Sequence, residues 1–410
     1  MLIYVFTDIH VKAEVFRIKL RGIQMKKVLI VGAGYAGAVC AQRFAEAGGY
    51  QVHIIDRRPH IGGNMYDSYN KDGILVHWYG PHISVMNNQR TFEFLSKFTE
   101  WVPYHHRVNV DIDGVEVPLP INFTSIDLLY PVDQAMSIKK ILMENYGEGT
   151  NVPILELRKS TDSRIQEFAN DIFEKVFFHY TAKMWGLAPE EIDPSVTGRI
   201  PVRLSYDNRH FLHKYQVMPK LGFTHLFEKM LNHPNISISL GVNAEHILKL
   251  DNVNKRVLVS GETFEGLVIY TGALDELFQF SKGELPYRSL RFQWETSHRN
   301  YVQDSTVLNW PDTRPETRRT EMKRLTGQKK EGITTTLVEF PGEYKRGSTV
   351  FGEPFYPIDA VPYKEIHRKY LEELKQYPQI IPVGRLADYK YYNMEAVILR
   401  ALSVMDEILN

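Results

Sequence analysis

The chain has 410 residues, of which 43% are hydrophobic and 24% charged, as is typical of a soluble globular protein. Its formal net charge is zero, so composition gives no support to binding of nucleic acid or of an anionic membrane. The one cysteine, Cys40, excludes an internal disulfide and favours a reducing, cytoplasmic location. Cys40 lies within an expected helix, where we predict a buried, apolar role. The length predicts two or three domains, or one large composite.

Residues 1–24 form an N-terminal extension before the first expected strand. The apolar run at its start is too short for a signal-peptide core, and charged residues interrupt it. We interpret the extension as a translated upstream segment or a misassigned start, with Met25 beginning the folded chain. The alternative is an added strand or contact element.

The first strong motif is a βαβ unit of the dinucleotide-binding type. An apolar run at residues 26–31 ends in the spacing Gly-x-Gly-x-x-Gly, and a second apolar strand ends at Asp56. We expect Gly32 to permit the tight turn, Gly34 to admit a pyrophosphate, and Gly37 to allow close helix–strand packing. The helix N-terminus offers free N–H groups to the phosphates, and Asp56 can accept hydrogen bonds from a ribose. A tight turn in an ordinary α/β domain is the plainer alternative.

A second glycine pair follows Arg57 and the basic turn beside it, in the stretch that contains Gly62, Gly63 and Asn64. Such a pair has no obvious role in a domain that binds only NAD, but it suits a longer cofactor, which predicts FAD. The next polar turn carries two histidines that have the appearance of a metal pair. No cysteine or carboxylate stands at ligand spacing, so we predict no metal and a structural or flavin-adjacent role for His82.

The middle of the chain alternates predicted helices and hairpins. Residues 91–101 have helical spacing, and Asp113-Gly114 joins two short strands in a hairpin. Residues 125–146 and 162–185 are predicted helices, with Ser137 and Asp162 as caps. Residues 188–203 are rich in proline and irregular, which is typical of a functional lid.

The last part of the chain is predicted to return to the cofactor domain. Residues 222–230 are helical, and strands between 236 and 269 lead into Thr271-Gly272. Residues 288–344 follow a period of two, with a basic loop that is either an anion site or, for most of it, a solvated strand edge. A Gly384-Arg385 turn and a helix to Leu409 complete the chain. The members of the basic loop are Arg314, Arg318, Arg319, Lys323 and Arg324.

Seven motifs, taken in order, resemble the UDP-galactopyranose mutase family from about Met25 to the C-terminus. They are VGAGYAGAVCA (31–41), HIGGN (60–64), YGPHI (79–83), YTAKMWG (180–186), GRIPVRLSYDN (198–208), LPYRSLRF (285–292) and GRLADYKYYNM (384–394). The resemblance implies an α/β fold with a discontinuous, Rossmann-like FAD-binding domain, an inserted helical domain and an antiparallel β-sheet domain.

We divide the chain accordingly. The FAD-binding domain takes residues 25–105, 221–285 and 358–410. The sheet domain takes 106–122, 201–220 and 286–357. The helical domain takes 123–200, with a mobile loop at 184–203.

The resemblance implies that the protein interconverts UDP-galactopyranose and UDP-galactofuranose. It implies that the cofactor is FAD, which is active when reduced, and that N5 of the flavin attacks the anomeric carbon of the sugar. It implies a nucleotide-sugar substrate, a homodimer, and a role in making furanose-containing polysaccharide. Tyr180 falls where the family stacks uracil, and Arg199 and Arg288 match the arginines that neutralise the diphosphate.

The glycine motifs and these matches together predict the residues of the site. The predicted catalytic residues are Arg199, Arg288 and His60. The predicted substrate-binding residues are Tyr180, Thr181, Trp185, Arg199, His210, Arg288 and Tyr391. The predicted cofactor-binding residues are Gly32, Gly34, Gly37, Asp56, Arg57, Gly62, Gly63, Asn64, His82, Arg385, Asn393 and Met394.

Four positions depart from the family pattern. Val85 replaces an active-site histidine, His210 replaces a phosphate-binding tyrosine, Glu316 stands where a Pro-Tyr-Thr-Arg run has its tyrosine, and Asn393 replaces an aspartate. Most of these positions lie where the sugar and diphosphate would bind. The departures therefore favour a different nucleotide sugar, such as UDP-N-acetylgalactosamine or a dTDP-fucose type.

Two further classes of function stay open at this point. One is a net-redox flavoprotein of the amine-oxidase type, which would share the cofactor fold. The paired arginines on a lid and the lack of a second glycine fingerprint for a nicotinamide argue against it. The other is a nucleotide-sugar-binding protein that has lost catalysis, which the departures permit.

Overall fold

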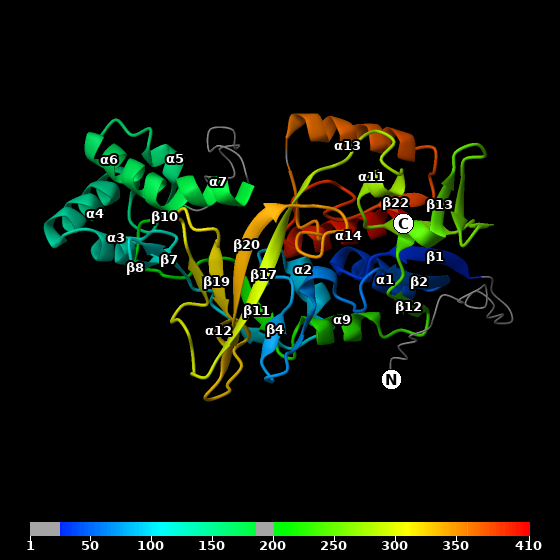
Figure 1. Cartoon of the computed structure of the whole chain (residues 1–410), viewed down its shortest axis with the longest axis horizontal. Coiled ribbons are helices and arrows are strands. Elements are labelled where there is room, and N and C mark those ends of the chain that lie inside the picture. The colour runs from blue at the N-terminus through cyan, green and yellow to red at the C-terminus, as the bar shows by residue number, and fades with distance from the viewer. Residues whose placement is uncertain (1–24, 186–200, 359) are drawn as a thin grey trace.

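The computed structural model describes residues 25–185, 201–358 and 360–410 of the chain (Figure 1). A parallel sheet with flanking helices lies at one end, a long mixed sheet lies in the centre, and a group of helices lies at the other end. This order follows the sequence only in part, because each sheet is built from segments that are far apart in the chain.

The parallel sheet has five strands in the order β12-β2-β1-β16-β22, and every neighbouring pair is parallel. The strands are β1 (Lys26–Val31), β2 (Tyr50–Asp56), β12 (Ile236–Leu240), β16 (Leu267–Tyr270) and β22 (Ile380–Pro382). Their carboxyl ends meet at one edge, which is where open α/β sheets bind ligands. The Rossmann-like α/β fold and the return of the chain after residue 236 are confirmed.

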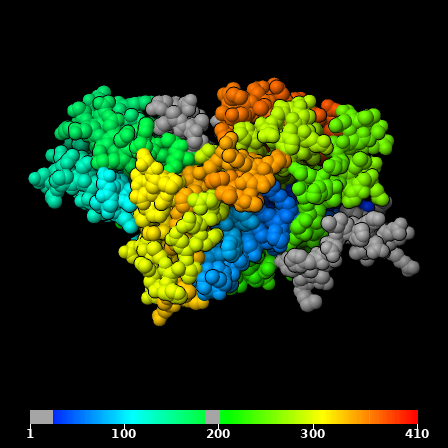
Figure 2. Space-filling model, in the orientation of Figure 1, coloured from blue at the N-terminus to red at the C-terminus, as the bar shows by residue number. Residues whose placement is uncertain are grey.

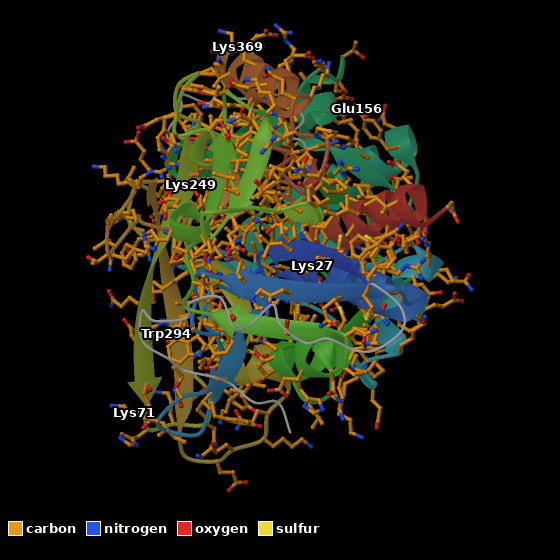
Figure 3. The ribbon with its side chains drawn as sticks, turned by 90° about the vertical axis from the view of Figure 1, so that its right-hand side faces the viewer. Lys27, Lys71, Glu156, Lys249, Trp294 and Lys369 are labelled. Carbon is orange, nitrogen blue, oxygen red and sulfur yellow. The ribbon has the colours of Figure 1, made fainter. Side chains whose placement is uncertain are left out.

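Helices cover one face of this sheet, and a mixed layer covers the other. The first face packs against α1 (Tyr35–Ala47), α9 (Phe223–Leu231) and α14 (Met394–Leu409). The second packs against α11 (Leu274–Leu277), α13 (Val361–Leu374) and the meander β13 (Leu248–Asp251), β14 (Arg256–Val259) and β15 (Glu262–Thr263). In Figure 3, the strand of the parallel sheet that carries Lys27 lies in the middle. Helix α13, which carries Lys369, lies on one side of it, and the turn that carries Lys71 lies on the other.

Cys40 lies at the centre of the first layer, on α1. It is fully buried in the core cluster, and burial raises the pKa of its thiol to about 12. The thiol therefore stays protonated and apolar, as the sequence predicts.

The central sheet has seven strands in the order β21-β17-β20-β19-β18-β7-β8. They are β7 (Val108–Ile112), β8 (Val115–Leu119), β17 (Tyr287–Ser297), β18 (Val307–Asn309), β19 (Arg318–Glu321), β20 (Thr334–Glu343) and β21 (Tyr356–Pro357). All neighbours are antiparallel except β18 and β7, which are parallel. The hairpin predicted at Asp113-Gly114 joins β7 to β8, with Asp113 and Gly114 both at positive φ.

The basic stretch predicted as a solvated edge lies elsewhere. Arg318 and Arg319 are in β19, which pairs on one side with β18 and on the other with β20, so it is an inner strand. Lys323 and Arg324 belong to the short helix α12 (Met322–Thr326). The period-two pattern does not reveal whether a strand is at the edge or inside, because that depends on pairing with distant segments.

The helical part contains α3 (Phe123–Leu129), α4 (Val132–Tyr146), α5 (Ile154–Leu157), α6 (Ser163–Ile172), the π-helix η3 (Phe173–Phe178) and α7 (His179–Trp185). The single helix predicted over 125–146 is wrong, because Pro131 separates α3 from α4 and disfavours helix at the residue before it. Ser137 lies inside α4 and is no cap, and Asn122 caps α3 instead. Asp162 caps α6 by accepting a hydrogen bond from Arg164 N, as predicted.

Smaller elements complete the description. They are η2 (Gly63–Met65), β3 (Asp67–Tyr69), β4 (Leu75–His77), β5 (Ser84–Met86), α2 (Gln89–Ser96), β6 (Trp101–Pro103), β9 (Asn151–Pro153), β10 (Pro201–Arg203), β11 (Tyr215–Pro219) and α10 (Ala244–Ile247). The helix predicted over 91–101 begins earlier and ends at Ser96, and Trp101 opens a strand.

The segment 201–220 contributes no strand to the seven-stranded sheet. β10 pairs with β9, next to the helices, and β11 pairs with β5 and β6. The division into domains stays a proposal, and the assignment of residues 201–220 to the sheet domain is the part that strand pairing does not support.

The segment between β20 and β21 lies against the N-terminal part of the chain. Figure 2 shows its orange surface lying beside the blue surface of the N-terminal part of the chain. Two ion pairs agree with this contact, since Glu353 binds Arg57 at 2.8 Å and Arg58 at 2.6 Å. Within the described ranges, no helix is long and apolar enough to cross a membrane.

Candidate functional site

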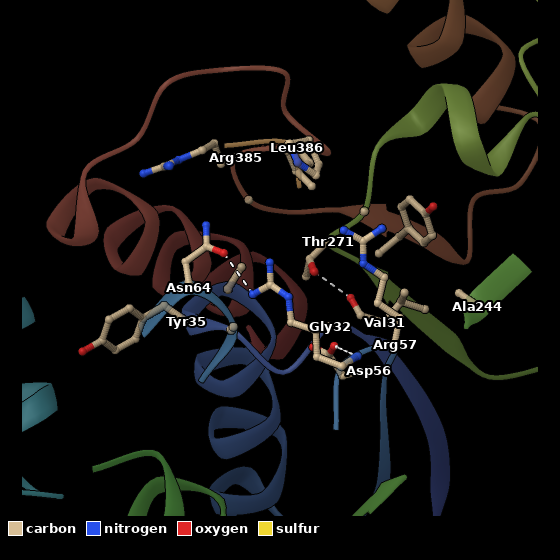
Figure 4. Close-up of a pocket in the computed structure, with 18 of the residues that line it drawn as sticks. Val31, Gly32, Tyr35, Asp56, Arg57, Asn64, Ala244, Thr271, Arg385 and Leu386 are labelled. Carbon is tan, nitrogen blue, oxygen red and sulfur yellow. Dashed lines mark hydrogen bonds between the residues drawn. The ribbon is translucent and has the colours of Figure 1, made fainter. Parts of the chain in front are cut away.

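A pocket opens at the carboxyl edge of the parallel sheet, between the two glycine turns and the N-terminus of α14 (Figure 4). Most of the residues predicted to bind a cofactor line it. These are Gly32, Gly34, Asp56, Arg57, Gly62, Gly63, Asn64, Arg385, Asn393 and Met394. Gly37 and His82 are not among its lining residues. Gly37 lies behind the pocket wall, and His82 lies beside the pocket.

The first turn requires glycine at two positions. Gly32 has a φ of +106°, and a Cβ there would lie 2.1 Å from Thr271 Oγ1. A Cβ on Gly37 would lie 1.9 Å from the carbonyl oxygen of Gly32. Gly37 therefore permits close packing of α1 against the turn, as predicted, and it acts from behind the pocket wall.

The second turn lies directly against the first. Gly62 N donates to the Ala33 carbonyl at 2.9 Å, and a Cβ on Gly63 would lie 2.9 Å from the Cα of Gly34. Two backbone segments without side chains thus form one wall of the pocket, which lets a long phosphate-containing ligand approach the main chain closely. This wall fits a dinucleotide that extends beyond a single βαβ unit.

Asp56 is held in place by the turns that it joins. Its Oδ2 accepts from Ala33 N at 2.8 Å, and its Oδ1 accepts from Arg58 N at 2.8 Å. A carboxylate has about four acceptor positions, so two remain for the predicted ribose contact. That contact stays a prediction, while the bonds to both turns show a structural role that the sequence did not indicate.

Two arginines and one carboxylate close the pocket on one side. Glu353 binds Arg57 and Arg58, and these arginines outweigh the effect of burial and lower the pKa of the Glu353 carboxyl. Arg58 also donates to Asn64 Oδ1 at 3.0 Å and lies over the ring of Tyr79 at 4.0 Å. The basic turn is thus tied to the β20–β21 segment across the mouth of the pocket.

The opposite end of the pocket is formed by the last turn and helix of the chain. Arg385 donates to the carbonyls of Phe355, at 2.9 Å, and Tyr392, at 2.5 Å. Asn393 caps α14 by accepting from Ala396 N at 2.8 Å. The N-terminus of α14 faces the pocket and adds a partial positive charge there.

His82 lies beside this end and is half-buried, with its Nδ1 atom shielded from solvent. Its Nδ1 has no hydrogen-bond partner among the described residues, although its backbone N–H donates to His77 Nδ1 at 3.3 Å. Burial, then the nearby His77 and Arg385, lower its pKa well below the usual value, so the ring is neutral. A buried ring nitrogen without a partner is costly, which favours a ligand beside it.

A second group of residues extends from Arg385 to α7. The Arg385 guanidinium lies 5.6 Å from the ring of Tyr356 and 5.3 Å from that of Tyr391. Tyr356 and Tyr391 are themselves 5.9 Å apart, between ring centroids. This aromatic pair joins the cofactor pocket to the strands of the central sheet.

Arg318 lies at the centre of the second group. It binds Glu339 Oε1 through Nε at 2.8 Å, and Glu339 is only 1% exposed. Burial opposes the Arg318 charge, but Glu339 and then Tyr180 outweigh it and raise its pKa. Burial raises the pKa of the Tyr180 hydroxyl, and Arg318 acts in the opposite direction, so the two residues are neighbours.

Arg318 was predicted only as a member of the basic loop. A signal for its position was present, because Arg318 is the arginine of the Pro-Glu-Thr-Arg run that aligns with a family motif. Of that run, only Glu316 was predicted to lie near the diphosphate, and the arginine was not.

Arg288, predicted to bind diphosphate, is bonded to the end of α7 in this structure. Its Nε donates to the Met184 carbonyl at 2.9 Å and its Nη2 to the Lys183 carbonyl at 3.2 Å. Arg288 thus lies next to the helix of Tyr180 and Thr181, and Thr181 is buried. Arg199 and the side chain of Trp185 lie outside the described residues.

Two predicted histidines are bonded to protein groups. His60 makes hydrogen bonds with Tyr79 Oη at 2.8 Å and the Ile61 carbonyl at 3.0 Å, and its ring stacks on Tyr66 at 3.8 Å. His60 is not a lining residue of the cofactor pocket. Both of its nitrogens are engaged, so its catalytic role stays a prediction without support from these contacts.

His210 makes its bond through Nδ1 to the Leu119 carbonyl at 2.8 Å. Burial lowers the pKa of its ring to about 4, although the bond to Leu119 acts in the opposite direction. The ring is therefore neutral at physiological pH and adds no positive charge for a phosphate. Among the described residues, no group of His, Cys, Asp and Glu side chains could hold a metal ion.

Comparison with known proteins places this geometry among nucleotide-sugar mutases. The family described as UDP-galactopyranose mutase matches residues 175–391, and a NAD(P)-binding Rossmann-like domain matches residues 30–98. A UDP-galactopyranose mutase of Mycoplasma pneumoniae is 32% identical, over 93% of this chain and 96% of its own length. A dTDP-fucopyranose mutase of Escherichia coli is 34% identical, over 92% and 97%. A probable UDP-galactopyranose mutase of Klebsiella pneumoniae is 34% identical, over 94% and 95%.

Solved structures agree on the fold. A reduced UDP-galactopyranose mutase superposes with a TM-score of 0.69 at 18% identity, over 94% of each chain. A putrescine oxidase reaches 0.56 at 12% identity, over 95% of this chain and all of the other. These likenesses show the fold alone, which flavin-dependent mutases share with amine-oxidising flavoproteins.

Proposed function

This chain belongs to the UDP-galactopyranose mutase family, a family of flavin-dependent nucleotide-sugar mutases, and we propose that it uses FAD to interconvert UDP-galactopyranose and UDP-galactofuranose. One observation carries the proposal furthest. Arg385 lines the cofactor pocket and also lies beside Tyr356 and Tyr391, which lead to Arg318 and Tyr180. A cofactor and a nucleotide sugar bound at these two places would meet at Arg385.

FAD fits the cofactor pocket better than a mononucleotide does. The paired glycine turns accept a diphosphate along the main chain, and Arg57 supplies positive charge beside them. At the far end, the N-terminus of α14, Arg385 and the unpartnered His82 Nδ1 surround the place for a flavin ring. When bound in the reduced state, the flavin supplies a nucleophilic nitrogen for the anomeric carbon.

The protein residues have binding and electrostatic roles in this proposal. Tyr180 offers a ring for stacking on the base. Arg318 and Arg288 offer guanidinium groups to the diphosphate, and Arg199 is a third candidate from the resemblance. Because UDP gains negative charge as it leaves the sugar, the arginines should increase the rate as well as the affinity.

The ion pair with Glu339 limits what Arg318 can contribute. Glu339 neutralises part of its charge and fixes its Nε, so the remaining N–H groups are those available to a phosphate. A fixed guanidinium loses little entropy on binding, which favours a rate effect over simple attraction.

A second candidate substrate is a dTDP-linked 6-deoxy sugar. The Escherichia coli relative named as a dTDP-fucopyranose mutase is as similar to this chain as the UDP-galactopyranose mutases are. The neutral His210, bonded to Leu119, and Asn393, engaged as a helix cap, both stand where the family places other residues. His210 is near Arg318, on the side that should contact the diphosphate, whereas Asn393 lines the cofactor pocket.

The deciding experiment is an anaerobic incubation of the dithionite-reduced protein with UDP-galactofuranose and, in parallel, dTDP-fucofuranose. Chromatography of the nucleotide sugars should show conversion of one to its pyranose without loss of reducing equivalents. In a separate aerobic assay, steady consumption of oxygen or NADPH with substrate would instead indicate a net-redox oxidoreductase. Bound UDP and flavin without conversion of either sugar would leave a binding protein.

The same proposal includes a homodimer and a cytoplasmic location, as the resemblance and the single cysteine suggest. Light scattering of the flavin-loaded protein tests the first, and cell fractionation tests the second.

A further inference from the structure

Lys183 lies three residues after Tyr180, on α7, and its side chain enters the connection between β18 and β19. Its Nζ donates to four backbone carbonyl oxygens, at distances between 2.8 and 3.0 Å. They belong to alternate residues of one segment, namely Trp310, Asp312, Arg314 and Glu316. We call this segment, residues 310–316, the carbonyl cage.

The cage has more acceptors than the lysine has protons. An ammonium group carries only three N–H bonds, so it cannot donate one to each of four carbonyls. The four oxygens, at similar distances, therefore stabilise its positive charge as well as accepting its hydrogen bonds. Rings of backbone carbonyls are how proteins replace the hydration shell of a small monovalent cation. The cage therefore has the chemistry of a cation site that the chain fills with its own lysine.

Side-chain carboxylates near the cage are engaged or at longer range. Asp312 binds the guanidinium of Arg314, with Nε at 2.9 and 2.8 Å from its two oxygens. Burial lowers the pKa of Lys183 to about 8, and the charges of Asp312 and Glu316 act against this effect. Glu316, whose carboxylate is unexpected beside a diphosphate, is thus close to a compensating positive charge.

The cage is connected to the nucleotide site at both ends. On one side, Lys183 belongs to the helix that carries Tyr180 and Thr181, and Arg288 binds the end of that helix. On the other side, Trp310 N donates to the Thr317 carbonyl at 2.8 Å, and Thr317 N donates to the Glu339 carbonyl at 2.9 Å. The next residue is Arg318, which binds the Glu339 side chain.

We propose that Lys183 is a positioning residue whose ammonium group fills the carbonyl cage and thereby sets the distance between Tyr180 and Arg318. A base stacked on Tyr180 and a diphosphate on Arg318 need that distance to be constant. Lys183 itself contacts protein atoms and no substrate. The proposal rests on the proposed function for its effect on nucleotide binding, but the cage can be tested without it.

The test replaces the lysine and supplies its charge from solution. Lys183→Ala is compared with Lys175→Ala, a lysine on the adjoining π-helix that is paired with Asp171 at the surface. Each flavin-loaded protein is measured in ammonium chloride and in tetramethylammonium chloride at equal ionic strength. Ammonium is small enough to enter the cage, whereas tetramethylammonium has no N–H bond and is too large.

Two readouts separate this inference from the proposed function. The first is the midpoint of thermal unfolding, which should rise with ammonium only in Lys183→Ala, because a cation that binds the folded state stabilises it. The second is the dissociation constant of UDP by calorimetry. Lys183→Ala should bind UDP on the order of tenfold more weakly, and ammonium should recover most of that loss.

The outcomes discriminate clearly. If the unaltered protein does not bind UDP, the proposed function fails and the melting experiment still judges the cage. If ammonium and tetramethylammonium act alike on Lys183→Ala, or if UDP affinity stays within twofold, the positioning role is overturned.

A conservative variant guards against a folding defect. Lys183→Arg keeps a charge with several N–H groups, and Lys183→Met keeps most of the stem without a charge. The arginine variant should retain more UDP affinity than the methionine variant. Equal loss in both, or failure of every variant to fold even in ammonium, would overturn the proposal.

Discussion

The guanidinium Nε of Arg288 lies 2.9 Å from the carbonyl oxygen of Met184, in the last turn of α7. A cation at a helix C-terminus is stabilised by the carbonyls that have no partner within the helix. The residue that the family resemblance assigns to the diphosphate therefore also holds the helix that carries Tyr180. A phosphate that binds Arg288 is therefore coupled, through this one side chain, to the end of α7.

Replacing Arg288 by lysine should weaken UDP binding about tenfold, because an ammonium group cannot make paired hydrogen bonds to phosphate and to the helix end. The measurement is calorimetry with UDP. Arg291→Lys is the matched control on the same strand, since its guanidinium lies over the ring of Phe340 at 3.6 Å. Equal effects of the two substitutions would contradict a specific role for Arg288.

Replacing Arg318 by methionine should both destabilise the protein and abolish UDP binding. Glu339 would remain buried without its partner, at a cost of about 3–5 kcal/mol in the free energy of unfolding. The double variant Arg318→Met with Glu339→Gln should recover much of that stability, because no buried charge is left. It should still fail to bind UDP. Recovered binding in the double variant would show that Arg318 acts only through the fold.

Replacing Gly32 by alanine should yield protein without flavin. The new Cβ would lie 2.1 Å from Thr271 Oγ1, which is held by a bond to the Val31 carbonyl at 2.7 Å. Gly48→Ala is the control, since Gly48 also has a positive φ but no atom within 4 Å of its added Cβ. The control should lose about 1–3 kcal/mol of stability from backbone strain and still bind flavin. The ratio of flavin absorbance to protein absorbance at purification checks the prediction.

Stability should fall as the pH decreases from about 6.5 towards 4. Burial lowers the pKa of His77, His82, His106 and His210, so the unfolded chain binds more protons than the folded one in this window. The free energy of unfolding therefore rises with pH in this window, and the rise is complete above pH 6.5.

The contribution of one histidine can be isolated. Burial, with smaller contributions from the charges of Arg203 and Arg318, lowers the pKa of His210 to about 4. His210→Tyr, which places the family residue there, should remove about one proton from the pH dependence. Melting temperatures between pH 4 and 7 give that slope, and an unchanged slope would contradict the assignment.

Local patterns predicted the cofactor half of the molecule well. The strand, the glycine turn, α1 and Asp56 lie within about thirty residues, and the constraints on φ, sterics and capping act over that range. The Asp162 cap and the Asp113-Gly114 hairpin were predicted for the same reason. The break at Pro131 was missed because apolar spacing continues across it, although the proline itself was the signal.

The substrate half was harder because its residues meet through long-range pairing. Arg318 was assigned to a basic loop that was either an anion site or, for most of it, a solvated strand edge, since nothing in its own stretch reveals strands on both sides of β19. Lys183 was not singled out at all, because its four partners lie some 130 residues later in the chain. No local pattern marks a backbone carbonyl as a ligand.

The sequence by itself therefore determined the family, the Rossmann-like α/β fold and the glycine turns of the cofactor pocket. Those features depend on residue types that only a few backbone conformations allow. The tertiary structure alone decided which partner each charged group has. Arg318 pairs with Glu339, Arg288 binds the Met184 carbonyl, and Lys183 binds the carbonyl cage. The first contact depends on the pairing of β19 with β20, and the other two depend on the docking of α7 against the central sheet. Both are determined by the whole core rather than by any one segment.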